Sequence, residues 1–157
     1  MKLWKKLTLT VTGLMLAAGI CCGLAIAGEG YKIYEEAVAV SSLEDKVEEI
    51  RSKDSFTEFE DLPQVYVEAV ISVEDQRFFS HPGIDLIAIG RAVLHDIQAG
   101  SFVEGGSTIT QQLAKNMYFS QEKELTRKAA EVFAAFDLER NYTKEEIFEL
   151  YVNSINF

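Results

Sequence analysis

The sequence predicts a mainly α-helical domain that follows an N-terminal transmembrane helix. Residues 7–27 contain no charged side chain, and the segments after them show apolar residues at spacings of three and four. Strand patterns are nearly absent, and neither an internal repeat nor a low-complexity tract interrupts the chain. With 157 residues, of which 48% are hydrophobic and 25% charged, the chain is long enough for one compact core.

The uncharged run of residues 7–27 is the predicted membrane anchor. At roughly 1.5 Å per residue it spans about 30 Å, the thickness of the hydrocarbon core of a bilayer. Three lysines in the tail of residues 1–6 precede it and an acidic segment follows, which favours a cytoplasmic N-terminus and an external body. A cleaved signal peptide is the alternative, because Ala25-Ile26-Ala27 has the form of a cleavage site. Both interpretations export the body.

Charge and cysteine content exclude several classes of function. The net charge is −10, and because the lysines of the tail have no acidic counterpart before residue 28, the body is more acidic still. Such a body does not attract nucleic acid by bulk electrostatics, and any anion that it binds must meet local cations. Both cysteines, Cys21 and Cys22, lie inside the apolar run. The body therefore has no disulfide framework, cysteine nucleophile or thiolate metal site.

Two segments of the body have an apolar face whose environment must be inferred. Residues 28–61 are expected to form an acidic connector, an amphipathic helix with a solvated charged face. Residues 84–99 form an apolar helix that ends at Gly100. A buried core helix is the simpler interpretation of this second segment, and a surface that dips into the membrane is the alternative.

Capping residues mark two further helices. Ser107 is the expected N-cap of a helix that ends near Tyr118. Thr143 and Glu146 have the spacing of a capping box at the start of the last helix. Between these two helices, residues 121–140 show a long apolar stripe.

The first candidate site is "VEDQRFFSHPG", in which Glu74 and Asp75 end a helix just before two phenylalanines and His81. A carboxylate desolvated by aromatic neighbours has a raised pKa, as a general base requires. A helix end that faces solvent is the alternative interpretation of the acidic pair. His81 has no second histidine at metal-ligand spacing, so a turn or core histidine is favoured over a ligand.

The second candidate site is "GGSTITQQLAKN", residues 105–116. On a helix, Thr108, Gln111, Gln112 and Lys115 share one face, opposite a stripe of apolar residues. A surface face usually carries Glu and Lys rather than paired Gln and Thr, which favours a binding face over a merely solvated one. The two glycines at its start allow the backbone to approach a ligand closely.

The third candidate site pairs Arg127 with Glu131, one helical turn apart. Arg ahead of Glu is the poorer orientation for a helical salt bridge, whereas Glu124 ahead of Lys128 is the better one. Glu124 and Lys128 can then form the structural pair, which would leave Arg127 and Glu131 free for a site. A salt bridge within the helix between Arg127 and Glu131 is the alternative. The last helix, "TKEEIFELYVN", is interpreted as scaffold.

Together these segments resemble glycosyltransferase family 51, the peptidoglycan transglycosylase domain of class A penicillin-binding proteins and monofunctional transglycosylases. The resemblance covers residues 62–157 and rests on four motifs in order. Glu-Asp-x-x-Phe-x-x-His-x-Gly matches Glu74, Asp75, Phe78, His81 and Gly83, and Gly-x-Ser-Thr-Ile-Thr-Gln-Gln matches residues 105–112. Arg-Lys-x-x-Glu matches Arg127, Lys128 and Glu131, and the fourth motif matches Lys144, Ile147, Glu149, Tyr151 and Asn153. Phe148 and Val152 replace the two leucines of that fourth motif.

The resemblance implies a lysozyme-like transglycosylase fold, incomplete here because the family domain continues beyond the fourth motif. It implies polymerisation of lipid II into β-1,4 glycan strands, with inversion at MurNAc C1 and release of undecaprenyl diphosphate. Glu74 would be the general base, and Glu131 a second catalytic carboxylate that orients the diphosphate or a divalent metal. The implied substrate-binding residues are Asp75, Phe78, His81, Ser107, Thr108, Gln111, Gln112, Lys115, Asn116, Arg127 and Lys128.

The same resemblance sets the expected surroundings of the reaction. No cofactor is required, with Mg²⁺ or Mn²⁺ at the diphosphate as the alternative. The expected partners are lipid II, the growing glycan strand, the bacterial cytoplasmic membrane and other cell-wall synthesis proteins, without nucleic acid. A single-pass protein with its N-terminus inside and its catalytic domain outside is expected. Two other functions stay open: a non-catalytic membrane-anchored fragment, and a muramidase-like hydrolase that has no need of cations at a diphosphate.

Overall fold

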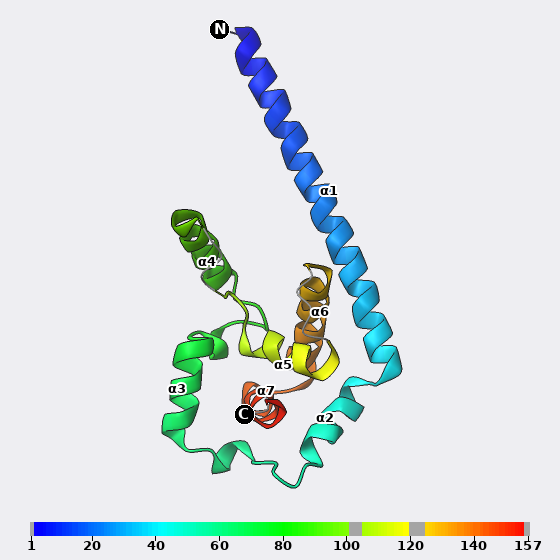
Figure 1. Ribbon diagram of the computed structural model, residues 1–157, viewed down its shortest axis with the longest axis vertical. Coiled ribbons are helices and arrows are strands. Elements are labelled where there is room, and N and C mark those ends of the chain that lie inside the picture. The colour runs from blue at the N-terminus through cyan, green and yellow to red at the C-terminus, as the bar shows by residue number, and fades with distance from the viewer. Residues whose placement is uncertain (1, 101–104, 120–124, 156–157) are drawn as a thin grey trace.

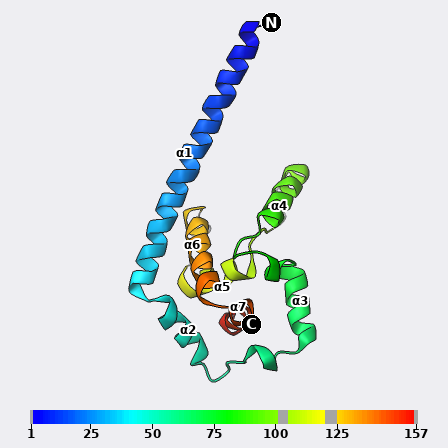
Figure 2. The same ribbon diagram turned by 180° about the vertical axis from the view of Figure 1, so that it is seen from behind.

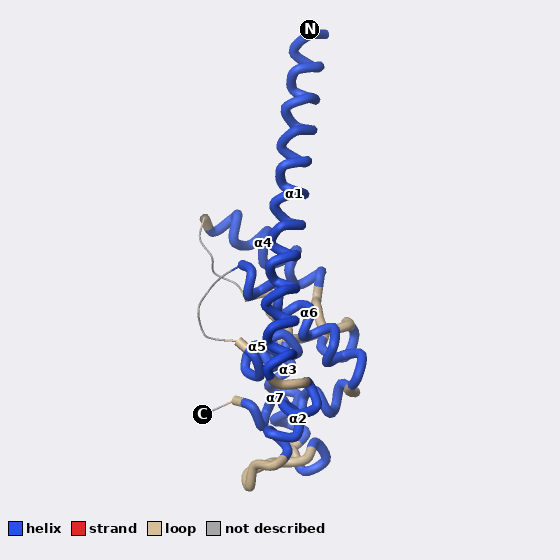
Figure 3. Tube along the Cα trace, turned by 90° about the vertical axis from the view of Figure 1, so that its right-hand side faces the viewer, coloured by secondary structure: helices blue, strands red, loops and turns tan. Residues whose placement is uncertain are grey.

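The computed structural model describes residues 2–100, 105–119 and 125–155, and within these ranges it contains helices and loops but no strand (Figure 3). This confirms the mainly α-helical prediction. The helices are α1 (Lys2–Val40), α2 (Leu43–Arg51), α3 (Gln64–Glu74), α4 (Leu86–Ala99), α5 (Ile109–Tyr118), α6 (Leu125–Asn141) and α7 (Lys144–Ser154), with short 3₁₀ turns at Phe59–Asp61 and Phe78–Ser80.

The long helix α1 extends from the body of the protein (Figure 1). Its stretch Leu7–Val40 is long and apolar enough to cross a membrane, by length and composition. The helix does not end where the uncharged run ends. It continues until Ser41, and α2 then begins with a capping box formed by Ser42 and Asp45. The acidic connector is therefore the last part of α1 followed by α2, whose apolar side chains are buried as its amphipathic pattern predicts.

The core lies where α5, α6 and α7 meet (Figure 1, Figure 2). Ile109 and Leu113 of α5, Leu138 of α6 and Phe148 of α7 are completely buried. Phe78, which follows α3, enters the same cluster and contacts the ring of Phe148, with ring centroids 6.1 Å apart. The spacing of apolar residues on these helices thus produces one common core.

The last helix has the scaffold role expected for it. Thr143 and Glu146 form the predicted capping box. Further along α7, Glu149 accepts a hydrogen bond from the backbone nitrogen of Phe59 at 2.9 Å. Asn153 bonds both backbone groups of Thr57, accepting from its nitrogen at 2.9 Å and donating to its oxygen at 2.8 Å. The fourth motif therefore holds the loop that leads into α3 and so helps to place Glu74.

Helix α4 differs from the simpler expectation for it. Among its apolar side chains Leu86, Ile87 and Ile97 are 71%, 66% and 73% exposed, and Ala92 is its one buried residue. The interpretation as a buried core helix was therefore wrong. The helix is capped by Asp85, ends at Gly100 in a left-handed conformation (φ 66°), and projects toward the same side as the N-terminal half of α1 (Figure 1).

Replacing Asn153 by alanine tests the clamp between α7 and the loop before α3. Asn153→Ala leaves two backbone groups of Thr57 without their partner, and we expect the free energy of unfolding to fall by about 1–3 kcal/mol. Urea unfolding of the full chain in detergent, followed by circular dichroism, measures this change. Asn141→Ala, which removes an exposed amide bonded to its own helical turn, should change it by less than about 0.5 kcal/mol. Equal stability of the two variants would contradict the clamp.

Candidate active site

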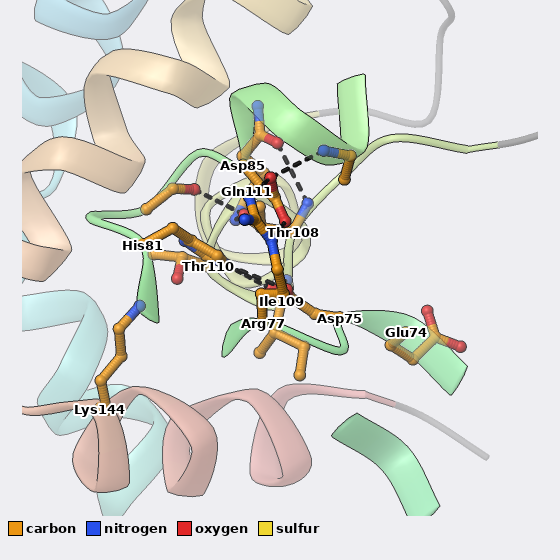
Figure 4. A network of polar contacts seen from close by, with 12 residues as sticks. Glu74, Asp75, Arg77, His81, Asp85, Thr108, Ile109, Thr110, Gln111 and Lys144 are labelled. Atoms are coloured by element: carbon orange, nitrogen blue, oxygen red, sulfur yellow. Dashed lines mark hydrogen bonds and ion pairs between the residues drawn. The ribbon is translucent and has the colours of Figure 1, made fainter. Parts of the chain in front are cut away.

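The two adjacent carboxylates at the end of α3 point in different directions. Glu74 is exposed, whereas Asp75, the C-cap residue, is buried with 7% exposure. Figure 4 shows the Glu74 carboxylate turned away from the polar network that Asp75 joins. Of the two interpretations of the acidic pair, the helix end that faces solvent holds for Glu74, because Phe78 lies in the core and leaves Glu74 open to solvent. Glu74 is instead held by a hydrogen bond from Gln112.

Asp75 connects the first motif to the second. Its two oxygens lie 3.0 and 2.9 Å from Nε2 of His81. One of them also accepts a hydrogen bond from the backbone nitrogen of Ile109 at 3.1 Å. Ile109 is the first residue of α5, so the carboxylate lies at the positive end of that helix, where a negative charge is stabilised. Asp75 thereby fixes the start of α5 relative to the end of α3.

His81 and Phe78 lie behind the surface rather than on it. His81 is 7% exposed, and its other ring nitrogen, Nδ1, is buried without a hydrogen-bond partner within the described residues. The ring of Phe78 is fully buried, and the ammonium of Lys144 lies over it in a cation–π contact, 4.4 Å from the ring centroid. Neither residue lines the two cavities beside Glu74. Both were predicted to bind substrate. In the structure His81 contacts Asp75, and Phe78 packs in the core.

The N-terminus of α5 corrects the predicted cap by one residue. Thr108, not Ser107, is the N-cap: its hydroxyl oxygen accepts from Gln111 nitrogen, and its own nitrogen donates to Oε1 of Gln111, both at 3.1 Å. The Thr108 hydroxyl donates to the backbone oxygen of Gly83 at 2.6 Å. Gly83 has φ +90°, and a Cβ there would lie 3.2 Å from the Ala135 oxygen, so glycine suits this close approach.

These bonds change the interpretation of the polar face on α5. Thr108 and Gln111 are 2% and 3% exposed, so the prediction that they share one open face with Gln112 and Lys115 was wrong for these two. Gln112 and Lys115 are half-buried and line the cleft. Asn116, also predicted to bind substrate, borders a different cavity, where its amide donates to the Ser154 hydroxyl at 3.4 Å.

Gln112 bridges Glu74 and Tyr151. Its Nε2 donates to Oε2 of Glu74 at 2.9 Å, and its Oε1 accepts from the Tyr151 hydroxyl at 3.3 Å. Burial, with a smaller contribution from the negative charge of Glu74, raises the pKa of Tyr151 to about 12. The hydroxyl is therefore a proton donor at neutral pH, which turns the amide oxygen of Gln112 toward it and the amide nitrogen toward Glu74. Tyr151 was expected only as a core residue, and no local pattern marks this role.

The third motif forms a cluster of two cations around one buried carboxylate. Glu131 is completely buried; it pairs with the Arg127 guanidinium and accepts from the Lys128 ammonium at 2.6 Å. The Lys128 ammonium also donates to the Ser107 hydroxyl at 2.6 Å. The prediction that Arg127 and Glu131 are unpaired was wrong, because a buried carboxylate requires compensation by neighbouring charge. The expected partner of Lys128, Glu124, lies outside the described residues.

The contacts of Glu131 also test the suggested metal. Both of its oxygens contact a cation, Arg127 or Lys128. A divalent ion could bind Glu131 only by displacing one of these side chains, and the positive charge that remained nearby would repel it. Within the described residues no three His, Cys, Asp or Glu side chains are grouped so as to hold a metal ion. The donor set at Glu131 therefore does not fit Mg²⁺ or Mn²⁺.

Glu74 stands between two cavities. The larger has a volume of about 440 Å³. Its lining includes Glu74 and Gln112 together with cations, the buried carboxylate and the loop before α5: Lys115, Arg127, Lys128, Glu131, Gly105 and Ser107. The smaller, about 120 Å³, includes Asp85 and Arg91, which the sequence did not single out. The larger cavity thus brings together residues of all three motifs that were expected to carry chemistry.

Asp85 stabilises the wall of the smaller cavity. It accepts from Nε of Arg77 at 2.8 Å and, as the N-cap of α4, from the Ala88 nitrogen at 2.7 Å. The Arg77 guanidinium holds the pKa of the Asp85 carboxyl well below its usual range. Since the folded-state pKa is depressed, this stabilisation is complete above the unfolded-state value of about 3.9 and is lost as the pH falls below it.

Asp85→Asn tests this charge pair, because asparagine is an equally good N-cap. We expect the variant to melt a few degrees below the wild type at pH 7, and the difference to shrink as the pH falls below about 4. Thermal unfolding followed by circular dichroism at several pH values measures it. Asp54→Asn, at an exposed turn, serves as the control and should not melt differently from the wild type. A difference for Asp85→Asn that stays constant from neutral to acid pH would contradict the assignment.

Comparisons with known proteins agree with this geometry. The family model described as "Transglycosylase" matches residues 42–157. Penicillin-binding protein 1F of Bacillus subtilis (strain 168) is 52% identical over 97 residues, which are 62% of this chain and 14% of that protein. Penicillin-binding protein 1A/1B of the same strain is 47% identical over 105 residues, 67% of this chain and 12% of that protein. Penicillin-binding protein 1A of Neisseria flavescens is 45% identical over 100 residues, 64% and 12% respectively.

The family match begins at residue 42, the cap of α2, so it includes α2 together with all four motifs. The chain spans 12–14% of the length of these curated relatives. Because the family model covers most of the chain and the motif residues meet in one cleft, the chain belongs to the transglycosylase family, glycosyltransferase family 51.

Proposed function

We propose that the chain carries the catalytic cleft of a peptidoglycan glycosyltransferase that polymerises lipid II. One observation carries the proposal: Glu74, held by Gln112, lines the same cleft as Lys115, Arg127 and Lys128. A base and a group of cations in one cleft are what transfer of a sugar from a diphosphate requires. The relatives named penicillin-binding proteins support the same class of reaction.

In the proposed reaction Glu74 accepts the proton of the 4-hydroxyl of the acceptor GlcNAc. The hydroxyl oxygen attacks C1 of the donor MurNAc and forms the new glycosidic bond, while the bond from C1 to the diphosphate oxygen breaks with its electron pair. Since the donor linkage is α and the product β-1,4, one inverting displacement suffices and no covalent enzyme intermediate is needed. Undecaprenyl diphosphate leaves, and the proton stays on Glu74 until solvent removes it.

The cations bind the leaving group. A diphosphate departs without a proton donor when positive charges meet the charge that develops on it. Arg127 and Lys128 are fixed by Glu131, so their positions are set before the substrate arrives. We therefore assign Glu131 as a positioning residue for these two cations rather than as a metal ligand. No metal is required in this proposal.

The cations also favour this function over the alternatives. A hydrolase of finished glycan strands has no phosphate to bind, and three cations beside the base would serve no purpose in it. The proposed location is the outer face of the cytoplasmic membrane. The lysines ahead of the apolar run favour a cytoplasmic N-terminus, and the exposed apolar face of α4 suits contact with lipid.

Glu74→Gln tests the base directly. Glutamine has the shape of glutamate but accepts no proton, and we expect polymerisation of fluorescent lipid II by the full chain in detergent to fall about 10²- to 10⁴-fold. Binding of lipid II should persist. Glu68→Gln makes the same change on the exposed surface of α3 and should leave the rate unchanged. Normal polymerisation by Glu74→Gln would contradict the assignment, and release of fragments from finished peptidoglycan without polymerisation would favour the hydrolase.

Lys115→Gln tests the role of the cations. Removal of one positive charge from the cleft should weaken binding of lipid II about tenfold, because hydrogen bonds between an ammonium and a phosphate are charge-assisted. The loss should be smaller at high salt, where screening already weakens the attraction. The matched control is Lys46→Gln on α2, whose ammonium pairs with Glu49 away from the cleft. Equal affinity for wild type and Lys115→Gln at every salt concentration would show that Lys115 does not meet the diphosphate.

A further inference from the structure

The packing of α1 against α6 joins the membrane helix to the helix that carries two of the cleft's cations. The hydroxyl of Tyr34 on α1 donates to Oδ2 of Asp137 on α6 at 2.8 Å. The rings of Tyr31 and Phe133 meet edge to face, with centroids 5.2 Å apart. Figure 1 and Figure 2 show the two helices side by side from opposite directions. The lower part of α1 is therefore packed on the body and does not act as a free tether.

At Gly30 the two helices approach so closely that no side chain fits between them. A Cβ added to this buried glycine would lie 2.5 Å from Cβ of Ala129, 2.9 Å from the nitrogen of Ala130 and 2.9 Å from the oxygen of Thr126. These atoms belong to the backbone or are attached to it, so they cannot move aside independently. Residues 126–130 also include Arg127 and Lys128, so Gly30 packs directly against the helical turn that carries these cations.

The position of Gly30 along α1 sets the height of this turn relative to a bilayer. The uncharged run ends at Ala27, and Gly30 follows three residues later, about 4.5 Å further along the helix axis. The run has the length of the hydrocarbon core, so in a bilayer that it spans its end would mark the boundary between acyl chains and headgroups. Arg127 and Lys128 consequently lie near the depth at which membrane lipids carry their phosphates.

We propose that Gly30 is a positioning residue that seats α6 on α1 and thereby holds Arg127 and Lys128 at the depth of lipid phosphates. This inference rests on the proposed function, because it takes the ligand of the cleft to be a lipid-linked diphosphate. Helix α4 is consistent with the same depth: it projects toward the side on which the N-terminal half of α1 lies, and most of its apolar side chains are exposed (Figure 1).

An insertion that changes the height but leaves the helix contact intact tests the proposal. Seven polar, helix-forming residues between Ala27 and Gly28 add almost two turns and move the body about 10 Å away from the bilayer. We expect lipid II binding to fall about 10- to 100-fold in phospholipid vesicles and to change less than about twofold in detergent micelles, where lipid and anchor move independently. The same seven residues placed between Trp4 and Lys5 lengthen the tail only and should alter neither value.

A second pair of variants tests Gly30 itself. Gly30→Leu forces α1 and α6 apart, whereas Gly28→Leu, two residues earlier on the same helix, meets no atom within 4 Å. In vesicles Gly30→Leu should raise the KM for lipid II about tenfold or more with a much smaller change in kcat, and Gly28→Leu should leave both unchanged. A lower stability alone would reduce the amount of active protein and hence kcat, not raise KM.

The outcomes separate this proposal from the proposed function. Wild-type binding without polymerisation would contradict the transferase activity, while the binding measurements would still decide the role of depth. Unaltered binding in vesicles by the variant with the insertion after Ala27 would overturn the proposal even if the wild type is fully active. Equal losses in vesicles and micelles would also overturn it, because they would indicate damage to the cleft rather than a change of height. A wild type that binds no lipid II would contradict both.

Discussion

The buried carboxylate of Asp75 joins the end of α3 to the start of α5. It accepts from the first backbone nitrogen of α5 and contacts the ring of His81, so three segments from two motifs meet at one charge. Glu74 precedes Asp75 directly and Gln112 lies one turn into α5. The hydrogen bond from Gln112 to Glu74 therefore depends on this contact. A carboxylate at the N-terminus of α5 suits this role, because the positive end of the helix dipole and the hydrogen bonds offset the cost of its burial.

Glu131 is a second buried carboxylate, and it lies beside the cations of the cleft. The carboxylate is buried, and it holds Arg127 and Lys128 in place while they compensate its charge. The two cations together exceed the one carboxylate in charge, so the cluster remains attractive to an anion. The motif residues thus divide into two groups. Asp75, His81 and Thr108 are buried and fix the backbone, whereas Glu74, Gln112, Lys115, Arg127 and Lys128 line the cleft. Glu131 belongs to both groups, because it is buried, lines the cleft and fixes two of its cations.

Local patterns predicted those features whose cause is local. The capping box of Thr143 and Glu146 and the apolar stripe of α2 formed as expected, because both depend on residues within one or two turns. The helix that is long and apolar enough to cross a membrane could be identified by its length and lack of charge. The sequence could not show which polar residues of α5 face the cleft, because Thr108 and Gln111 have the same polarity whether they cap the helix or bind a ligand. Only the position of Gly83, far away in the sequence, decides between the two roles.

Other errors had the same origin in distant contacts. An apolar helix such as α4 has the same sequence pattern whether it is buried in a core or exposed. Its exposure depends on where the other helices pack, and the sequence of α4 does not contain that information. The orientation rule for helical ion pairs disfavoured a pair between Arg127 and Glu131, yet burial of Glu131 outweighs this small preference. The bridge from Tyr151 through Gln112 to Glu74 connects three helices and leaves no signal in any of them.

The measurement that tests the account most directly is the stability and activity of Asp75→Asn. The substitution preserves the shape of the side chain and removes its charge. The account predicts that the free energy of unfolding falls by about 1–3 kcal/mol and that the rate of lipid II polymerisation falls with it, because α5 and Glu74 lose their common anchor. Wild-type stability and a wild-type rate in the same variant would contradict the claim that this carboxylate organises the cleft.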